Sequence, residues 1–198
     1  YVDFGELIRQ RSELVVPLKP SEIEQAITGP AHRVGLQVDA DLTATIVSDI
    51  REEPGALPLL QFLLTELYER RNRLHLTLSA YQQLGGVRGA LASRAEEAFQ
   101  ALSEDHQSVA EQTFLRLITL GEGTEDTRRR VTQLELRNAI SDEHILKSIL
   151  DVFGSIRLLT FDIDPLSRIP TVEIAHEALI REWQRLREWL NDSRDDIR

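Results

Sequence analysis

The stretch Thr171-Val-Glu-Ile-Ala-His-Glu-Ala-Leu-Ile-Arg-Glu-Trp183 changes from one secondary-structure pattern to another. Val172 and Ile174 lie on one face of an alternating run, which predicts a strand, and the spacing that follows predicts an amphipathic helix from Glu177 to about Asn191. His176 lies at the junction, where free backbone N–H groups and the positive end of a helix dipole favour an anion such as a phosphate. The spacing alone also allows a simpler role, in which His176 only caps the helix or fills a surface gap.

The residues before this stretch predict several helices. Thr132-Gln-Leu-Glu135 forms a capping box that opens a short helix, and Ser141 is the predicted cap of the next one, which Gly154 ends. The apolar spacing predicts helices over 87–102, 104–118, 132–140 and 142–153.

A β-hairpin is expected between these helices and the last one. Its strands are Ile156–Ile163 and Ile169–Ala175, and Asp164-Pro165-Leu-Ser is the turn. The order of short helices and hairpin is typical of a winged-helix domain, in which the hairpin is the wing.

The N-terminal half also has the pattern of a helical bundle. Ser21 and Glu24 form a predicted capping box for a helix that ends before Pro30, and a second helix is expected after Asp39 or Asp41. Residues 55–68 are apolar nearly all round, which is typical of a buried central helix. A short extended run over 74–78 and a brief helix that Ser79 caps then precede Gly85-Gly86, the predicted domain boundary.

Composition limits the possible functions. The 198 residues include 21 Arg, 2 Lys and no Cys, and the net charge is −10. This charge argues against a broad nucleic-acid or membrane surface, and the lack of Cys excludes disulfides and makes a cytoplasmic location the default. No apolar run approaches the ~20 residues of a membrane helix. Because the chain lacks Met, we expect it to be part of a longer protein.

The stretch around His176 resembles a known family. Ile174-Ala-His-Glu-Ala-Leu-Ile-Arg-Glu-Trp183 is similar to the hydrophobic-His-acid motif that ends the winged-helix domain of STAND-class signalling NTPases. Glu177 stands in place of the usual Asp, which resembles the bacterial branch, often coupled to WD-type repeats. The resemblance implies that His176 contacts the β-phosphate of ADP. The substitution leaves open whether Glu177 steadies His176.

Two further motifs support this resemblance. Gly55-Ala-Leu-Pro-Leu-Leu60 is similar to the Gly-Leu-Pro-Leu motif of the STAND helical lid, which implies that Pro58 packs on the adenine and makes Gly55 a weaker candidate. The run Gly121-Glu-Gly-Thr-Glu-Asp-Thr-Arg-Arg-Arg130 resembles a recurrent signature of the bacterial branch without an assigned role. Its arginines, Arg128, Arg129 and Arg130, either pair with acids of a neighbouring domain or reach a nucleotide, unless the run is simply a solvated loop and edge strand.

The resemblance implies a mainly α fold in three parts: 1–18 as the tail of an upstream NTPase core, 19–85 as a helical lid and 86–198 as a winged-helix domain. It implies a switch in which ADP or ATP, with Mg²⁺, is bound by an upstream P-loop core and clamped by Pro58 and His176. A downstream repeat sensor domain and self-association on activation are the implied partners. The chain has no Gly-x-x-x-x-Gly-Lys-Ser/Thr motif, so we expect no catalytic residue and no hydrolysis by this part alone.

The same residues also bear on other possible functions. A protein-interaction scaffold that binds no nucleotide remains an alternative. A DNA-binding regulator is disfavoured because the candidate recognition helix, Asp142–Phe153, carries Asp142, Glu143 and Asp151 against only Lys147. No metal site is expected, since Ile180 stands where a zinc-protease motif beginning at His176 needs a second His. The carboxylate pair Glu96-Glu97 is expected to be a solvated face.

Overall fold

The computed structural model of the protein describes residues 6, 11, 16–50, 56–121 and 124–196, and helices predominate in these residues, as predicted. The helices are α2 (Pro20–Arg33), α3 (Ala40–Ile50), α4 (Ala56–Glu69), α5 (Leu78–Gln83), α6 (Gly86–Gln100), α7 (Glu104–Arg116), α8 (Gln133–Ala139), α9 (Glu143–Ser155), α10 (Ala178–Glu182) and α11 (Gln184–Asp196). Most of the predicted tail at 1–18 and the candidate Gly55 lie outside the described residues.

The strands form three small sheets. Strands β1 (Gln37–Val38) and β2 (His75–Leu76) pair in parallel, and β3 (Ile118–Thr119) pairs antiparallel with β4 (Thr127–Arg128). The third sheet has the order β5-β7-β6 and consists of β5 (Val131–Thr132), β7 (Pro170–Ile174) and β6 (Leu159–Ile163). In this sheet Phe161 lies opposite Val172, so β6 and β7 form the predicted hairpin.

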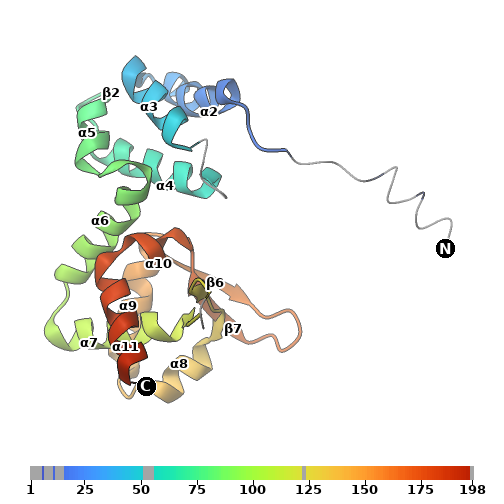
Figure 1. Ribbon diagram of the computed structural model, residues 1–198, viewed down its shortest axis with the longest axis vertical. Coiled ribbons are helices and arrows are strands. Elements are labelled where there is room, and N and C mark those ends of the chain that lie inside the picture. The colour runs from blue at the N-terminus through green and yellow to red at the C-terminus, as the bar shows by residue number, and fades with distance from the viewer. Residues whose placement is uncertain (1–5, 7–10, 12–15, 51–55, 122–123, 197–198) are drawn as a thin grey trace.

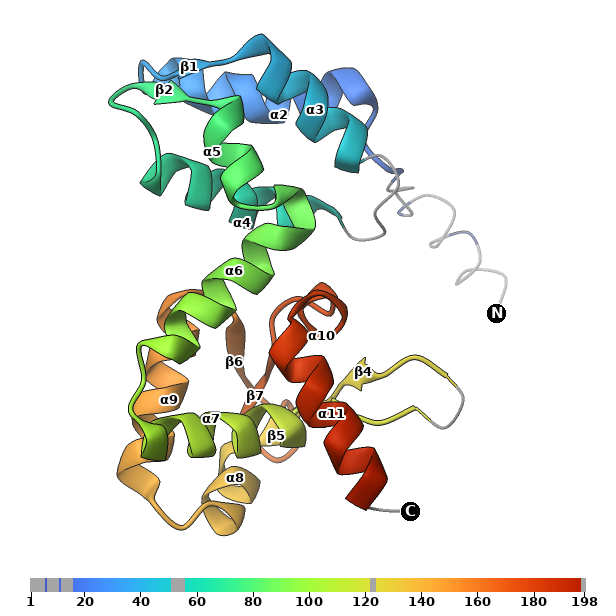
Figure 2. The same cartoon turned by 60° about the vertical axis from the view of Figure 1, so that its left-hand side comes forward.

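The helix α6 joins two lobes (Figures 1 and 2). The N-terminal lobe contains α2 to α5, and the C-terminal lobe contains α7 to α11 and the three-stranded sheet. α6 packs against α3, α4 and α5 of one lobe and against α7, α9 and α10 of the other, and the buried residues of both lobes form one hydrophobic cluster. Gly85 and Gly86, the predicted boundary, begin this helix with φ values of 76° each, a conformation that favours glycine.

Several predicted helix starts in the N-terminal lobe are displaced. The Ser21–Glu24 capping box is wrong: α2 begins at Pro20, and the Glu22 carboxylate accepts a hydrogen bond from the backbone N–H of Lys19 at 2.7 Å. Proline is well tolerated in a first turn because its nitrogen needs no partner there. α2 also continues through Pro30 to Arg33, with Ala31 buried. α5 is capped by Thr77, whose hydroxyl accepts from the N–H of Ala80, and not by Ser79.

The helix boundaries of the C-terminal lobe are mostly as predicted. The Thr132 hydroxyl accepts from the backbone N–H of Glu135, which confirms this cap of α8. The Asp142 carboxylate, and not Ser141, caps α9 by accepting from the N–H of Ile145 at 3.0 Å. Gly154 lies inside α9 and does not end it. A Cβ at Gly154 would lie 2.5 Å from the Phe161 ring, so this glycine allows β6 to approach the helix closely.

The predicted continuous helix from Glu177 to Asn191 is wrong, because the chain breaks into α10 and α11 at Trp183. This residue has an extended backbone, with φ −81° and ψ 104°, between two helical segments. Its side chain is 1% exposed and packs edge-on against Phe114 and Trp189, with ring centroids 5.2 and 5.3 Å away. Burial of the indole in this cluster offsets the loss of helical hydrogen bonds at the break.

Candidate functional site

His176 lies between β7 and α10, as the pattern predicted. The backbone around it is fixed by two hydrogen bonds, from the N–H of Ala175 to the Leu158 carbonyl at 2.9 Å and from the N–H of Leu179 to the His176 carbonyl at 3.0 Å. The imidazole is half-buried. Burial lowers its pKa, and the positive charge of Arg128 lowers the pKa further. Both causes favour the neutral ring, which keeps one N–H as a donor.

The His176 ring contacts α4 of the N-terminal lobe. Its centroid lies 5.9 Å from that of Phe62, with the two rings at 68°. Phe62 is 5% exposed and is therefore a fixed partner. Residues four apart lie on the same side of a helix, so Pro58 is one turn from Phe62 on this side of α4. The helix that begins with the Pro58 motif therefore contacts the histidine of the other motif through Phe62.

Pro58 is in the first turn of α4, as expected, and its side chain is exposed. The neighbouring Leu57 is 51% exposed, whereas Leu59 and Leu60 belong to the core. The start of α4, the helix that also carries Phe62, therefore presents a small exposed apolar surface at Leu57 and Pro58. The apolar pyrrolidine ring of Pro58 can make van der Waals contact with a planar aromatic group.

The three arginines of the 128–130 run have different partners. Arg129 forms an ion pair with Glu135 at 2.9 Å, and Arg130 pairs with Glu173 at 2.9 Å and with Asp162 at 3.5 Å. Arg128 instead reaches toward His176: its guanidinium donates to the backbone carbonyl of Ile174 over 3.4 Å. No Asp or Glu among the described residues forms an ion pair with Arg128. Only this arginine of the run is directed at the predicted site.

Glu177, which stands at the acidic position of the motif, is exposed. No hydrogen bond joins its side chain to His176 within the described part of the chain. The backbone of Glu177 begins α10, since its carbonyl accepts from the N–H of Ile180 at 3.0 Å. The ring of His176 is therefore held by Phe62 and by burial, without a carboxylate partner from this residue.

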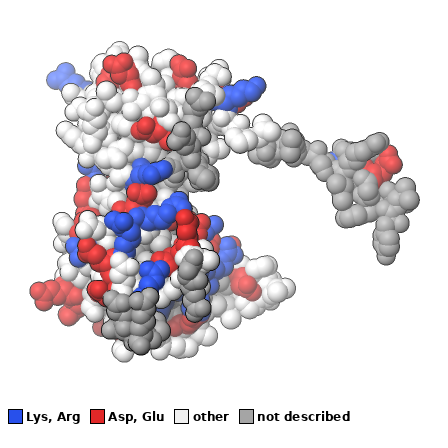
Figure 3. Space-filling model, in the orientation of Figure 1, with Lys and Arg blue, Asp and Glu red and all other residues white. Residues whose placement is uncertain are grey.

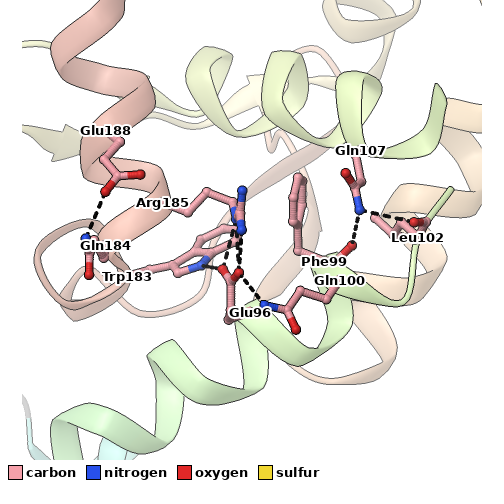
Figure 4. Close-up of polar contacts among 9 residues, drawn as sticks. All are labelled: Glu96, Phe99, Gln100, Leu102, Gln107, Trp183, Gln184, Arg185 and Glu188. Atoms are coloured by element: carbon pink, nitrogen blue, oxygen red, sulfur yellow. Dashed lines mark hydrogen bonds and ion pairs between the residues drawn. The ribbon is translucent and has the colours of Figure 1, made fainter. Parts of the chain in front are cut away.

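The expectation that Glu96 belongs to a solvated face is wrong. Figure 4 shows its carboxylate between α6 and the α10–α11 break, where Arg185, Trp183 and Gln100 converge on it. The Arg185 Nε lies 3.0 Å from Oε2, the Trp183 Nε1–H donates to Oε2 at 2.8 Å, and the Gln100 amide donates to Oε1 at 2.9 Å. The hydrogen bonds from Arg185 lower the pKa of Glu96 to about 2, since they outweigh the effect of burial and are aided by those from Trp183 and Gln100.

Glu66 is a second carboxylate that the pattern did not single out. It lies on α4, is 4% exposed, and its Oε2 has no hydrogen-bond partner among the residues that the structure describes. Arg94 and Arg70 are 3.7 and 3.8 Å away, too far for good hydrogen bonds. Burial raises the pKa of Glu66 despite these arginines. A cavity of about 160 Å³ adjoins Glu66 and is also lined by Phe62 and Arg94. Glu66 and Arg94 therefore lie near Phe62, the residue that contacts His176.

Neither a membrane-spanning helix nor a metal site is found among the described residues. None of their helices has the length and apolar character that crossing a membrane requires. No group of three or more His, Asp and Glu side chains is arranged there to hold a metal ion.

The comparisons with known proteins give one result for the whole chain. A family model described as Novel STAND NTPase 1 matches residues 1–198. No curated protein matches the chain, and no solved structure does.

Proposed function

The chain belongs to the Novel STAND NTPase 1 family, and from this premise we propose that it is the regulatory lid and winged-helix part of a STAND ATPase switch. In this proposal residues 19–85 are the lid, residues 86–198 are the winged-helix domain, and both close over a nucleotide bound by an upstream P-loop core. The succession α7, β5, α8, α9, β6 and β7 supports the winged-helix assignment, because this domain needs a compact helix set followed by a hairpin.

The contact between Phe62 and His176 is the observation that carries the proposal. It joins the helix that begins with Pro58 to the loop that carries the histidine, at a centroid distance of 5.9 Å. A clamp on one nucleotide needs its base-binding and phosphate-binding residues on one side of the molecule. Phe62 links the two elements that carry these residues.

The side chains at this place suit an adenine nucleotide. The exposed ring of Pro58 suits packing against the base, and the N–H of neutral His176 suits a hydrogen bond to a phosphate oxygen. Half-burial of the imidazole strengthens such a bond, because less water competes for it. ADP held by the core would thus be contacted by both lobes of this chain.

The proposed switch is a shift between closed and open arrangements of the chain and its core. A ligand shifts such an equilibrium only through a difference in its contacts with the two states. Contacts of His176 with ADP favour the closed state. Exchange of ADP for ATP changes the phosphate group that His176 contacts. We further propose a downstream repeat sensor domain, self-association in the open state and a cytoplasmic location.

The charges do not favour DNA as the ligand. The exposed side chains of α9 and of its N-cap residue include Asp142, Glu143 and Asp151 against Lys147. On the face shown in Figure 3, acidic and basic residues are interspersed and form no continuous basic area. A protein helix that binds in a DNA groove needs an excess of Lys and Arg near it to neutralise the phosphates.

The test is the nucleotide content of the purified full-length protein. We expect wild type to retain ADP, and we expect His176→Ala and Pro58→Ala each to weaken ADP binding by ~10- to 100-fold, the effect of removing one good contact. His144→Ala, which removes an exposed histidine of α9, is the matched control and should retain ADP like wild type. If folded wild type carries no nucleotide, or all variants retain equal amounts, the proposal fails.

A further inference from the structure

We propose that Arg128 is a second phosphate-binding residue, which contacts the same terminal phosphate of a nucleoside diphosphate as His176. This inference rests on the proposed function. It assigns a role to one arginine of the 128–130 run and excludes the other two from the site. Arg128 lies close to His176, forms no ion pair with an Asp or Glu of the described residues, and affects the charge state of the imidazole.

The position of Arg128 is set by the β3–β4 hairpin. Arg128 lies opposite Ile118 in this antiparallel pair, and the N–H of Arg129 donates to the Leu117 carbonyl at 2.7 Å. Asp126, just before β4, accepts from the N–H of Gly121 at 2.9 Å and forms an ion pair with Arg194 of α11. The backbone at Arg128 is therefore anchored to α7 and α11 before any ligand binds.

The guanidinium of Arg128 retains most of its hydrogen-bonding capacity. The one side-chain hydrogen bond that it makes to the described residues, to the Ile174 carbonyl, is long at 3.4 Å. Its neighbours Arg129 and Arg130 are held by carboxylates at 2.9 Å. A guanidinium has five N–H donors and binds phosphate oxygens in pairs, so Arg128 can accept an anion that its neighbours cannot bind without breaking an ion pair.

Arg128 and His176 also influence each other electrostatically. Burial lowers the pKa of His176, and the positive charge of Arg128 lowers it further. Within the described residues, no carboxylate forms an ion pair with this cation, which destabilises the protonated ring. A phosphate between the two side chains would accept hydrogen bonds from both and offset this repulsion.

The experiment compares ADP dissociation constants of the full-length protein, measured by calorimetry, for Arg128→Gln and for Arg130→Gln. We expect Arg128→Gln to weaken ADP binding by ~10- to 100-fold, since a charged hydrogen-bonded contact is lost. Arg130→Gln loses only exposed ion pairs and should bind ADP within ~3-fold of wild type. Arg128→Lys, which keeps the charge but not the paired donors, should lie between the two. Thermal unfolding of each variant verifies that it is folded.

The outcomes separate this inference from the proposed function. If wild type binds ADP and His176→Ala weakens binding, but Arg128→Gln binds as Arg130→Gln does, Arg128 is not a phosphate ligand and the proposed function stands. If wild type binds no ADP, the proposed function itself fails. Arg128→Gln combined with His176→Ala tests direct contact: a further loss beyond His176→Ala supports it, and an unchanged dissociation constant overturns it.

Discussion

Replacement of Trp183 by alanine is expected to destabilise the protein by ~3–5 kcal/mol, the usual cost of removing a large buried aromatic side chain. Trp183 is 1% exposed and contacts Phe99, Phe114 and Trp189, which come from α6, α7 and α11. Its loss leaves a cavity where these three helices meet. Urea unfolding of the wild type and the variant measures the difference.

Trp183→Phe separates the two roles of this residue. Phenylalanine keeps most of the packing but lacks the Nε1–H that donates to Glu96 at 2.8 Å. We expect a smaller cost of ~1–3 kcal/mol, from the lost hydrogen bond and a smaller cavity. If Trp183→Ala costs no more than Trp183→Phe, packing of the indole is not what stabilises the break between α10 and α11.

Glu96→Gln is expected to have the second largest effect on stability, ~2–4 kcal/mol at neutral pH. The substitution removes the charge that faces Arg185, and a partly buried cation then loses its counterion. Trp183 also loses a charged acceptor, although the glutamine carbonyl can still accept one hydrogen bond. Glu97→Gln on the same helix is the control: Glu97 is 48% exposed, and its ion pair with Arg70 is expected to contribute under ~1 kcal/mol.

The effect of Glu96→Gln should depend on pH in a defined direction. The pKa of Glu96 is about 2 in the folded protein, against 4.5 for an unperturbed glutamate. The unfolded chain therefore takes up the proton first, and the stabilisation is fully present above about pH 4.5 and is lost as the pH falls toward 2. Unfolding curves from pH 6 to pH 2 should show the wild type and Glu96→Gln converging. A difference in the free energy of unfolding that stays constant down to pH 2 would contradict the role of the Glu96 charge in this stabilisation.

Local signals predicted most of the fold. The helical spacing, the Thr132 cap and the β6–β7 hairpin follow from neighbouring residues, and the structure confirms them. The wrong caps at Ser21, Ser79 and Ser141 share one cause. Each lies within two residues of a group that makes the actual cap, and such short-range choices depend on backbone angles that a pattern does not specify.

Long-range contacts account for what the pattern missed. The break at Trp183 follows from aromatic partners on α6, α7 and α11, which the helical spacing around it does not reveal. Glu96 is half-buried and is hydrogen-bonded to Arg185, and the two are far apart in sequence. The contact of His176 with Phe62 likewise joins residues that are far apart in sequence. The motifs identified His176 and Pro58 as candidates, but only the fold shows that α4 and the His176 loop meet.

In the proposed switch, Pro58 and His176 contact the same nucleotide. The most direct test is a structure of the full-length protein purified with ADP. We predict that the adenine packs on Pro58 and that a β-phosphate oxygen accepts a hydrogen bond from His176, at a heavy-atom distance of about 3 Å. A bound nucleotide that contacts neither residue would contradict this proposal. So would a folded protein, closed around its core, in which other side chains fill the space beside Pro58 and His176 and leave no room for a nucleotide.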